Sequence, residues 1–260
     1  NMINGPVWNE SILKREGVFP TILAIGDSWF WYPENNLASP LHNIVNRRHT
    51  HVILVRGHNG AEALEYQSGP IRAQIEQDLD RDKGYGRTLK AVFLSGGGND
   101  LAGSDDLPQL LLENCRAATS AAACLRAGQP EQLFRRVRDS LLSVVALVEK
   151  KIPGTPVFIH GYDYACPNGE GFLGLGQWLQ FPMDQCKVKR TLHQDLVNVL
   201  IDRFRVALEE VQAQAPSVRL VDGRKTLSPA DWANELHPTV PGFNRLAKCW
   251  QAPLETAGIA

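Results

Sequence analysis

Five short apolar runs recur along the chain, and each ends in a glycine-containing or polar stretch. They cover residues 21–25, 52–55, 91–94, 156–159 and 218–221. Each run is rich in β-branched residues and nearly continuous in apolarity, which is typical of strands covered by helices on both faces. We therefore expect five strands of a buried parallel sheet.

Segments with helical periodicity separate these runs. Apolar residues recur every three or four positions after Pro70, from 131 to 150, from 188 to 212, and from 241 past Trp250. Such stripes predict amphipathic helices with one face against a sheet. The alternation of strands and helices predicts an α/β fold, with a three-layer α/β/α arrangement in a single domain over residues 1–260.

Two stretches interrupt this alternation, at about 102–130 and 162–185. The first is rich in leucine and alanine and is expected to be helical, while the second is rich in glycine and aromatic residues. Both follow a predicted strand, so both should lie over the carboxyl edge of the sheet. Long insertions in a compact domain are usually functional, and we interpret these as walls or a lid of a substrate pocket. A structural flap is the alternative.

Composition narrows the choice of function. The 260 residues are 43% hydrophobic and 21% charged, with a formal net charge of −1. A nucleic-acid partner is not expected, because it would require a basic stripe. No apolar run reaches membrane-spanning length, and no secretory signal precedes the first predicted strand. A cytoplasmic location is favoured, with export as the alternative if a signal was trimmed, and the oligomeric state stays open.

The cysteines do not indicate a metal site. Five are present, without a C-x-x-C pair and without histidines at metal-ligand spacing, so neither a metal nor another cofactor is expected. Cys166 and Cys186 bracket the second insertion and could be bridged in an exported protein. Small buried hydrophobic residues are the expected role for most of the cysteines.

Four polar features stand where chemistry collects in an open α/β sheet, at strand ends or before the last helix. Ser28 follows the first run, Gly60 the second and Asn99 the third, and His237 precedes the final helix. A serine hydroxyl needs a base within hydrogen-bond reach, and a histidine can take its proton and later return it. An oxyanion needs fixed donors, which the Ser28 and Gly60 N–H groups and the Asn99 amide can supply.

These four stretches resemble the blocks of the SGNH (GDSL-type) hydrolase superfamily. Ser28 matches its nucleophile, Gly60 the glycine of the second block, Asn99 in Gly-Gly-Asn-Asp the oxyanion-hole amide, and His237 the histidine of the last block. The resemblance covers residues 20 to 245 and implies a flavodoxin-like sheet with strand order 2-1-3-4-5.

The last block departs from the family pattern. Asn234 stands three residues before His237, where the family usually carries aspartate. A neutral amide can accept a hydrogen bond from an imidazole, but it stabilises imidazolium less than a carboxylate does. Asn234, Glu235 and Asp231 are all candidates for the group that orients His237. A Ser28–His237 dyad, with a backbone carbonyl as the orienting group, is a further alternative.

The residues and the resemblance together predict a serine hydrolase that cleaves carboxylic esters through an acyl-enzyme. The substrate would be a small-molecule, glycan or lipid ester. A polysaccharide O-deacetylase and a thioesterase or lysophospholipase of the same superfamily are alternatives. A catalytically weak ligand-binding protein is the alternative from a different class, because a fold alone does not fix a function.

Overall fold

The computed structural model describes residues 3–32, 35–47, 51–171 and 178–260 and contains one five-stranded sheet. Its strands are β1 (Ile22–Gly26), β2 (Ile53–Gly57), β3 (Ala91–Leu94), β4 (Val157–His160) and β5 (Val218–Val221). All neighbouring pairs are parallel, and the order is β2-β1-β3-β4-β5. The expected fold class and strand order are confirmed, with strand bounds shifted by no more than two residues.

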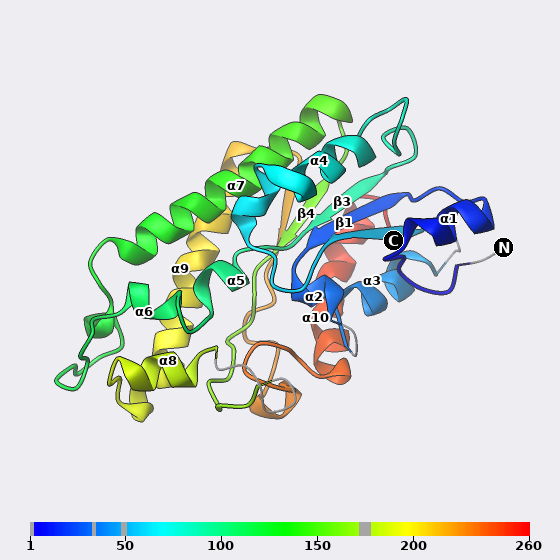
Figure 1. Ribbon diagram of the computed structural model, residues 1–260. Helices are drawn as coiled ribbons and strands as arrows, with labels where there is room; N and C mark the ends of the chain where they lie inside the picture. The colour runs from blue at the N-terminus through cyan, green and yellow to red at the C-terminus, as the bar shows by residue number, and fades with distance from the viewer. Residues whose placement is uncertain (1–2, 33–34, 48–50, 172–177) are drawn as a thin grey trace.

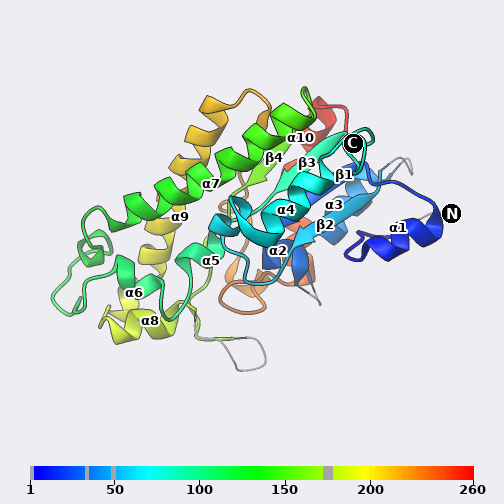
Figure 2. The same cartoon turned by 45° about the horizontal axis from the view of Figure 1, so that its top comes forward.

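Helices cover both faces of this sheet (Figure 1). The helices α3 (Ala38–Val45) and α10 (Val240–Thr256) pack together on one face. On the other face lie α4 (Gly69–Asp78), α7 (Gln129–Lys151) and α9 (His193–Gln214), and the tilted view in Figure 2 shows α7 and α9 side by side. This separation follows from right-handed crossovers between parallel strands.

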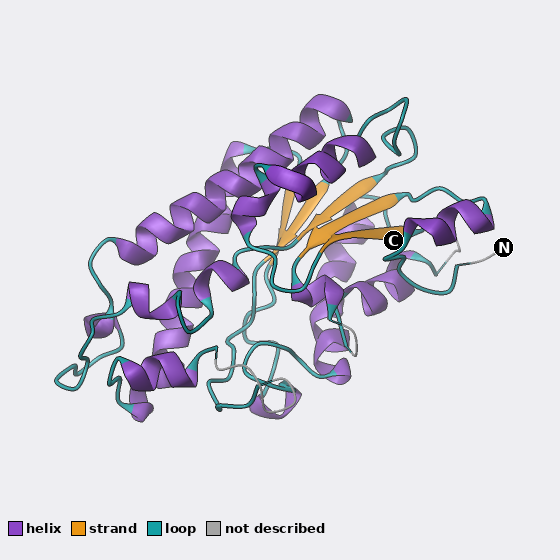
Figure 3. Ribbon diagram, in the orientation of Figure 1, coloured by secondary structure: helices purple, strands orange, loops and turns teal. Residues whose placement is uncertain are grey.

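Shorter elements complete the fold and gather mainly at the carboxyl edge of the sheet, where Figure 3 shows most of the loops. The N-terminal α1 (Glu10–Glu16) is the exception, because its chain pairs with β2 through the Val7–Leu54 bridge. The remaining short helices are α2 (Ser28–Trp31), α5 (Gly98–Leu101), α6 (Leu107–Leu110) and α8 (Gln180–Gln185).

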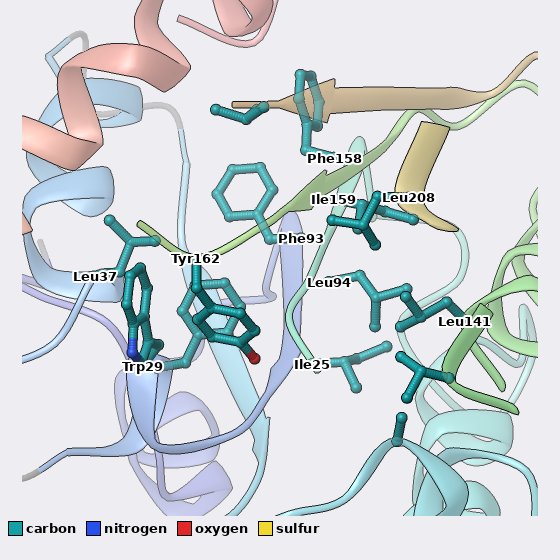
Figure 4. Packing of buried hydrophobic residues seen from close by; sticks show 14 of the residues in the cluster. Ile25, Trp29, Leu37, Phe93, Leu94, Leu141, Phe158, Ile159, Tyr162 and Leu208 are labelled. Atoms are coloured by element: carbon teal, nitrogen blue, oxygen red, sulfur yellow. The ribbon is translucent and has the colours of Figure 1, made fainter. Parts of the chain in front are cut away.

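The core fills the space between the sheet and its helices. Every residue of β1, β3 and β4 is buried, which explains why these strands are continuous apolar runs in the sequence. Phe93 and Phe158 lie on neighbouring strands with ring centroids 5.7 Å apart, and both pack near Trp250 of α10. Figure 4 shows these strands' side chains leading to Trp29 and Tyr162 at the carboxyl edge.

Two helix predictions differ from the structure, one in where the helix starts and one in whether a helix forms at all. The helix predicted from Val188 begins at His193, because Lys187 adopts a left-handed backbone (φ 57°) and Arg190–Leu192 form a 3₁₀ turn. The segment 102–130 is largely irregular, with only α6 and a 3₁₀ turn before α7 begins at Gln129. Its backbone groups pair across a loop instead, since Leu111 and Leu125 form an antiparallel bridge.

The cysteines are all free thiols. Cys166 and Cys186, which sequence reasoning considered as a conditional bridge, are therefore not joined, and three of the five are buried as expected of small hydrophobic residues. Within the described residues, no helix combines the length and apolarity needed to cross a membrane.

Candidate active site

Ser28 lies just beyond the carboxyl end of β1, which is flanked by β2 and β3 in the sheet. β1 ends at Gly26, and Asp27 accepts a hydrogen bond from the Trp29 N–H at 3.0 Å, so that α2 starts at Ser28. The chain can turn this sharply because β2 also ends in glycine. At Gly57 φ is +100°, and an added Cβ would lie 2.0 Å from the Gly26 carbonyl oxygen. The serine is half-buried at the edge where the loops gather.

His237 comes from a compact turn that leads into α10. Trp232 and Pro238 form an antiparallel bridge, and the Thr239 N–H donates to the Asp231 carbonyl at 2.7 Å. Thr239 then caps α10 by accepting the Gly242 N–H. Because both ends of the turn are fixed, the buried imidazole of His237 has a defined position.

The structure brings Ser28, His237 and Asn234 into one line of hydrogen bonds. Ser28 Oγ lies 2.8 Å from His237 Nε2, and His237 Nδ1 lies 3.0 Å from Asn234 Oδ1. This arrangement has the geometry of a nucleophile, a base and an orienting group. Of the three candidates for the last position, Asn234 is the one that contacts His237.

The orientation of the Asn234 amide is fixed by its other contacts. Its Oδ1 also accepts the backbone N–H groups of Leu236 at 3.0 Å and His237 at 2.9 Å, and its Nδ2 faces the hydroxyl of Tyr32 at 3.4 Å. An oxygen that receives two N–H donors must also be the acceptor toward His237 Nδ1. His237 therefore carries its proton on Nδ1 and turns the lone pair of Nε2 toward Ser28.

The surroundings of His237 keep it neutral. Burial lowers its pKa from the usual 6.5 to about 4. The Tyr32 ring stacks on the imidazole with centroids 4.0 Å apart and planes at 12°, and Trp178 meets it edge-on at 5.7 Å. A neutral imidazole can accept the serine proton at neutral pH. Among the described residues its Nδ1 partner is an amide and not a carboxylate, so the imidazole stays a weak base.

Glu235 and Asp231 bind elsewhere, although both are buried. Glu235 turns away from His237 and accepts four backbone N–H groups of the second insertion, from Gly169, Trp178, Leu179 and Gln180. Asp231 accepts the N–H and hydroxyl of Ser228 and lies 3.4 Å from Arg245. Their roles are therefore to hold the loops around the site.

The three groups considered as oxyanion donors lie shortly after β1, β2 and β3. Asn99 Nδ2 donates to the Ala61 carbonyl at 2.9 Å, which holds the amide beside the β2 loop and leaves its second N–H for a ligand. Gly60 lies in that loop with φ +80°. Within the described parts of the chain, neither the Gly60 N–H nor the Ser28 N–H has an acceptor.

Sequence reasoning missed the side chains that hold these loops together. Buried Asp27 accepts hydrogen bonds from the Ser95 hydroxyl at 3.1 Å and from the Tyr162 hydroxyl, so it links the ends of β1, β3 and β4. The Trp29 indole N–H donates to the Leu236 carbonyl at 3.0 Å, which ties the residue after Ser28 to the residue before His237. An aspartate directly after a strand indicates a helix cap, which Asp27 is, but its links to Ser95 and Tyr162 depend on strands that are distant in the sequence.

A metal centre finds no support in the described part of the chain, where no three His, Cys, Asp or Glu side chains are grouped as ligands.

Comparisons with known proteins agree with this architecture. The model of the GDSL-like Lipase/Acylhydrolase family matches residues 24–245. Among solved structures, the lipase Lip_vut3 from a goat rumen metagenome is 15% identical with a TM-score of 0.55, and the match covers 93% of this chain and 98% of that chain. Phospholipase A1 from Streptomyces albidoflavus NA297 is 16% identical with a TM-score of 0.54, covering 91% and 98%.

Axe2, an acetylxylan esterase from Geobacillus stearothermophilus, is 15% identical with a TM-score of 0.53, and the match covers 91% of this chain and 93% of that chain. No curated protein matches the sequence. Identities this low show the shared fold, whereas the family match spans most of the chain and includes Ser28, Gly60, Asn99 and His237. This chain belongs to the GDSL-like lipase/acylhydrolase family.

Proposed function

We propose that this protein is a serine hydrolase that cleaves carboxylic esters through an acyl-enzyme on Ser28. Membership of the family indicates a hydrolase acting on esters. The observation that carries the finer proposal is the 2.8 Å contact between Ser28 Oγ and the unprotonated Nε2 of a buried, neutral His237. A serine with such a base has the arrangement needed for nucleophilic attack.

The reaction proceeds in two halves. Ser28 Oγ attacks the ester carbonyl carbon while its proton moves to His237 Nε2, and the carbonyl oxygen becomes an oxyanion. The N–H groups of Ser28 and Gly60 and the Asn99 amide stabilise this charge. Collapse of the intermediate breaks the bond to the alcohol oxygen, which takes the proton from His237. Water then attacks the acyl-enzyme with His237 again as base, releasing the acid and restoring Ser28.

Asn234 fixes the imidazole tautomer and gives no charge to the imidazolium that forms. The imidazole is therefore correctly oriented, but its charged form is stabilised less than by a carboxylate. We expect a turnover below that of a carboxylate-containing triad.

A reactive-serine probe and simple esters test the proposal. Wild type should be labelled covalently at Ser28 by a fluorophosphonate and should hydrolyse p-nitrophenyl acetate, whereas Ser28→Ala and His237→Ala should lose at least 10³-fold in kcat. Folded wild-type protein that is neither labelled nor active would instead favour the ligand-binding alternative. Deacetylation of acetylated polysaccharide and hydrolysis of thioesters or lysophospholipids would separate the remaining substrate classes.

A further inference from the structure

A cavity opens beside Ser28 and Asn99 and reaches α9. Its walls come from both insertions and from that helix, so segments far apart in the sequence enclose one space. The apolar side chains that form most of its lining include Leu101, Ala102, Ala165, Leu179, Val197 and Ile201.

The two carboxylates in the lining are already occupied. Asp27 accepts hydrogen bonds from the Trp29 N–H and from two hydroxyls. Asp163 accepts four backbone N–H groups, from Tyr164, Lys225, Thr226 and Leu227. A sugar or a charged group would find few partners here, because buried polar groups of a ligand need hydrogen bonds. The cavity therefore suits a hydrocarbon.

The position of His237 determines whether the acyl half or the alcohol half of an ester occupies the cavity. His237 must lie near the leaving oxygen, because it gives that oxygen its proton. The described residues that line the cavity include Ser28 and Asn99 but not His237. The acyl half, which stays bonded to Ser28, therefore points into the cavity, while the alcohol leaves on the His237 side.

The cavity is also small. Its volume of about 50 Å³ is roughly a third of the 150 Å³ of an engineered apolar cavity that binds benzene. We infer that the cavity is an acyl-binding pocket for a short acyl group of about two to four carbons, an inference that rests on the proposed ester hydrolysis at Ser28. Esters of longer acids should be poor substrates, because their chains meet the side chains of α9.

Two substitutions in opposite directions test this pocket. Ile201→Ala removes three carbons from the far wall, and Ala165→Leu adds three to the lining. Leu200→Ala is the matched control, since Leu200 is an equally buried residue of α9 that does not line the cavity. The measurement is kcat/KM for p-nitrophenyl acetate, butyrate and octanoate, with the active fraction of each variant determined by titration with a small fluorophosphonate.

Wild type should prefer acetate or butyrate over octanoate by at least tenfold, since one methylene in an apolar pocket changes the rate by roughly 10–200-fold. Ile201→Ala should reduce this preference at least tenfold, Leu200→Ala should leave it unchanged, and Ala165→Leu should lower the butyrate-to-acetate ratio. A wild type that prefers octanoate, or equal profiles for Ile201→Ala and Leu200→Ala, overturns the pocket while leaving the esterase standing. Absence of both labelling and hydrolysis removes the esterase and the pocket together.

Discussion

Asn234 is the residue at which this site departs from a carboxylate-containing triad. Its oxygen already receives the Leu236 and His237 N–H groups in addition to His237 Nδ1. An aspartate at position 234 could accept the same three donors, so Asn234→Asp should fold. It would place a negative charge about 3 Å from an imidazole whose pKa burial now lowers to about 4.

That charge favours the imidazolium and so raises the pKa of His237. Since the base must be neutral to accept the serine proton, the acidic limb of the kcat/KM profile should move to higher pH by about one to three pH units. At about pH 4–5, wild type should therefore retain a larger share of its maximal kcat/KM than Asn234→Asp does. Identical acidic limbs would show that Asn234 does not act on His237.

Tyr32 is the second residue whose role can be measured. Its ring stacks on His237, and its hydroxyl lies 3.4 Å from Asn234 Nδ2. Tyr32→Phe keeps the stack and removes the hydroxyl, and a lost neutral hydrogen bond of about 1 kcal/mol corresponds to roughly a fivefold fall in kcat. KM should change little, because Tyr32 contacts the base and not the acyl pocket. A change confined to KM would argue against a positioning role.

Sequence reasoning identified this site only in part, and the reasons are local. The hydrogen bonds from Asn234 to the two N–H groups that follow it are short-range, of the kind that Asn forms in turns, and could have been anticipated from its spacing to His237. That Glu235 does not contact His237 could not have been anticipated, because the partners of Glu235 lie 55 to 66 residues away in the second insertion.

At the scale of elements, Glu235 connects two segments. It lies in the turn that contains His237, and it anchors the second insertion, which contains Leu179, to that turn. Glu235→Gln keeps the size but loses the charge and one acceptor oxygen, while four N–H groups still need partners. Because hydrogen bonds to a charged group contribute about 1.5–3 kcal/mol each, the insertion should open more readily. Hydrogen exchange should speed up at residues 169–171 and 178–185, and kcat/KM should fall.

A control for this substitution exists in Asp163→Asn. Asp163 also accepts four backbone N–H groups, but three of them belong to residues 225–227 after β5. Exchange should then increase in that loop. Should Glu235→Gln accelerate exchange equally throughout the protein, Glu235 would contribute to global stability and not to this anchor.

Strands were easier to predict than insertions. The three central strands, β1, β3 and β4, are fully buried, so each appears in the sequence as a continuous apolar run whatever its partners are. Between 102 and 130, alanine-rich composition favoured a helix, but tertiary pairing of Leu111 with Leu125 and burial of Cys115 and Cys124 determine the conformation. Local propensity is a weak guide where such long-range contacts compete with it.

On the scale of the whole molecule, the parallel sheet is what assembles the site. Ser28, Gly60 and Asn99 follow strands β1, β2 and β3, which are neighbours in the sheet and end at the same edge. Residues separated by up to 71 positions, from Ser28 to Asn99, are therefore brought to the same edge of the sheet. The register of β1 and β2 places Gly26 opposite Gly57, just before Asp27 and Ser28.

Substitutions at Gly57, the last residue of β2, and at Gly60, in the loop that follows, distinguish a role in the fold from a role in binding. Gly57 has φ +100°, and its added Cβ would lie 2.0 Å from the Gly26 carbonyl oxygen, whereas Gly60 has φ +80° with nothing within 4 Å. Gly57→Ala should lower the free energy of unfolding by at least about 3 kcal/mol, from backbone strain and overlap together. Gly60→Ala should lower it by only about 1–2 kcal/mol and keep its N–H in place.

Urea unfolding gives the two stabilities, and fluorophosphonate labelling reports whether Ser28 is still activated. Gly57→Ala should lose labelling together with stability, since the β1 end that carries Ser28 must move. Gly60→Ala should remain labelled, because the oxyanion donor at this position is a backbone group that alanine retains. The reverse order of stabilities would mean that the contact between the ends of β1 and β2 does not fix the position of Ser28.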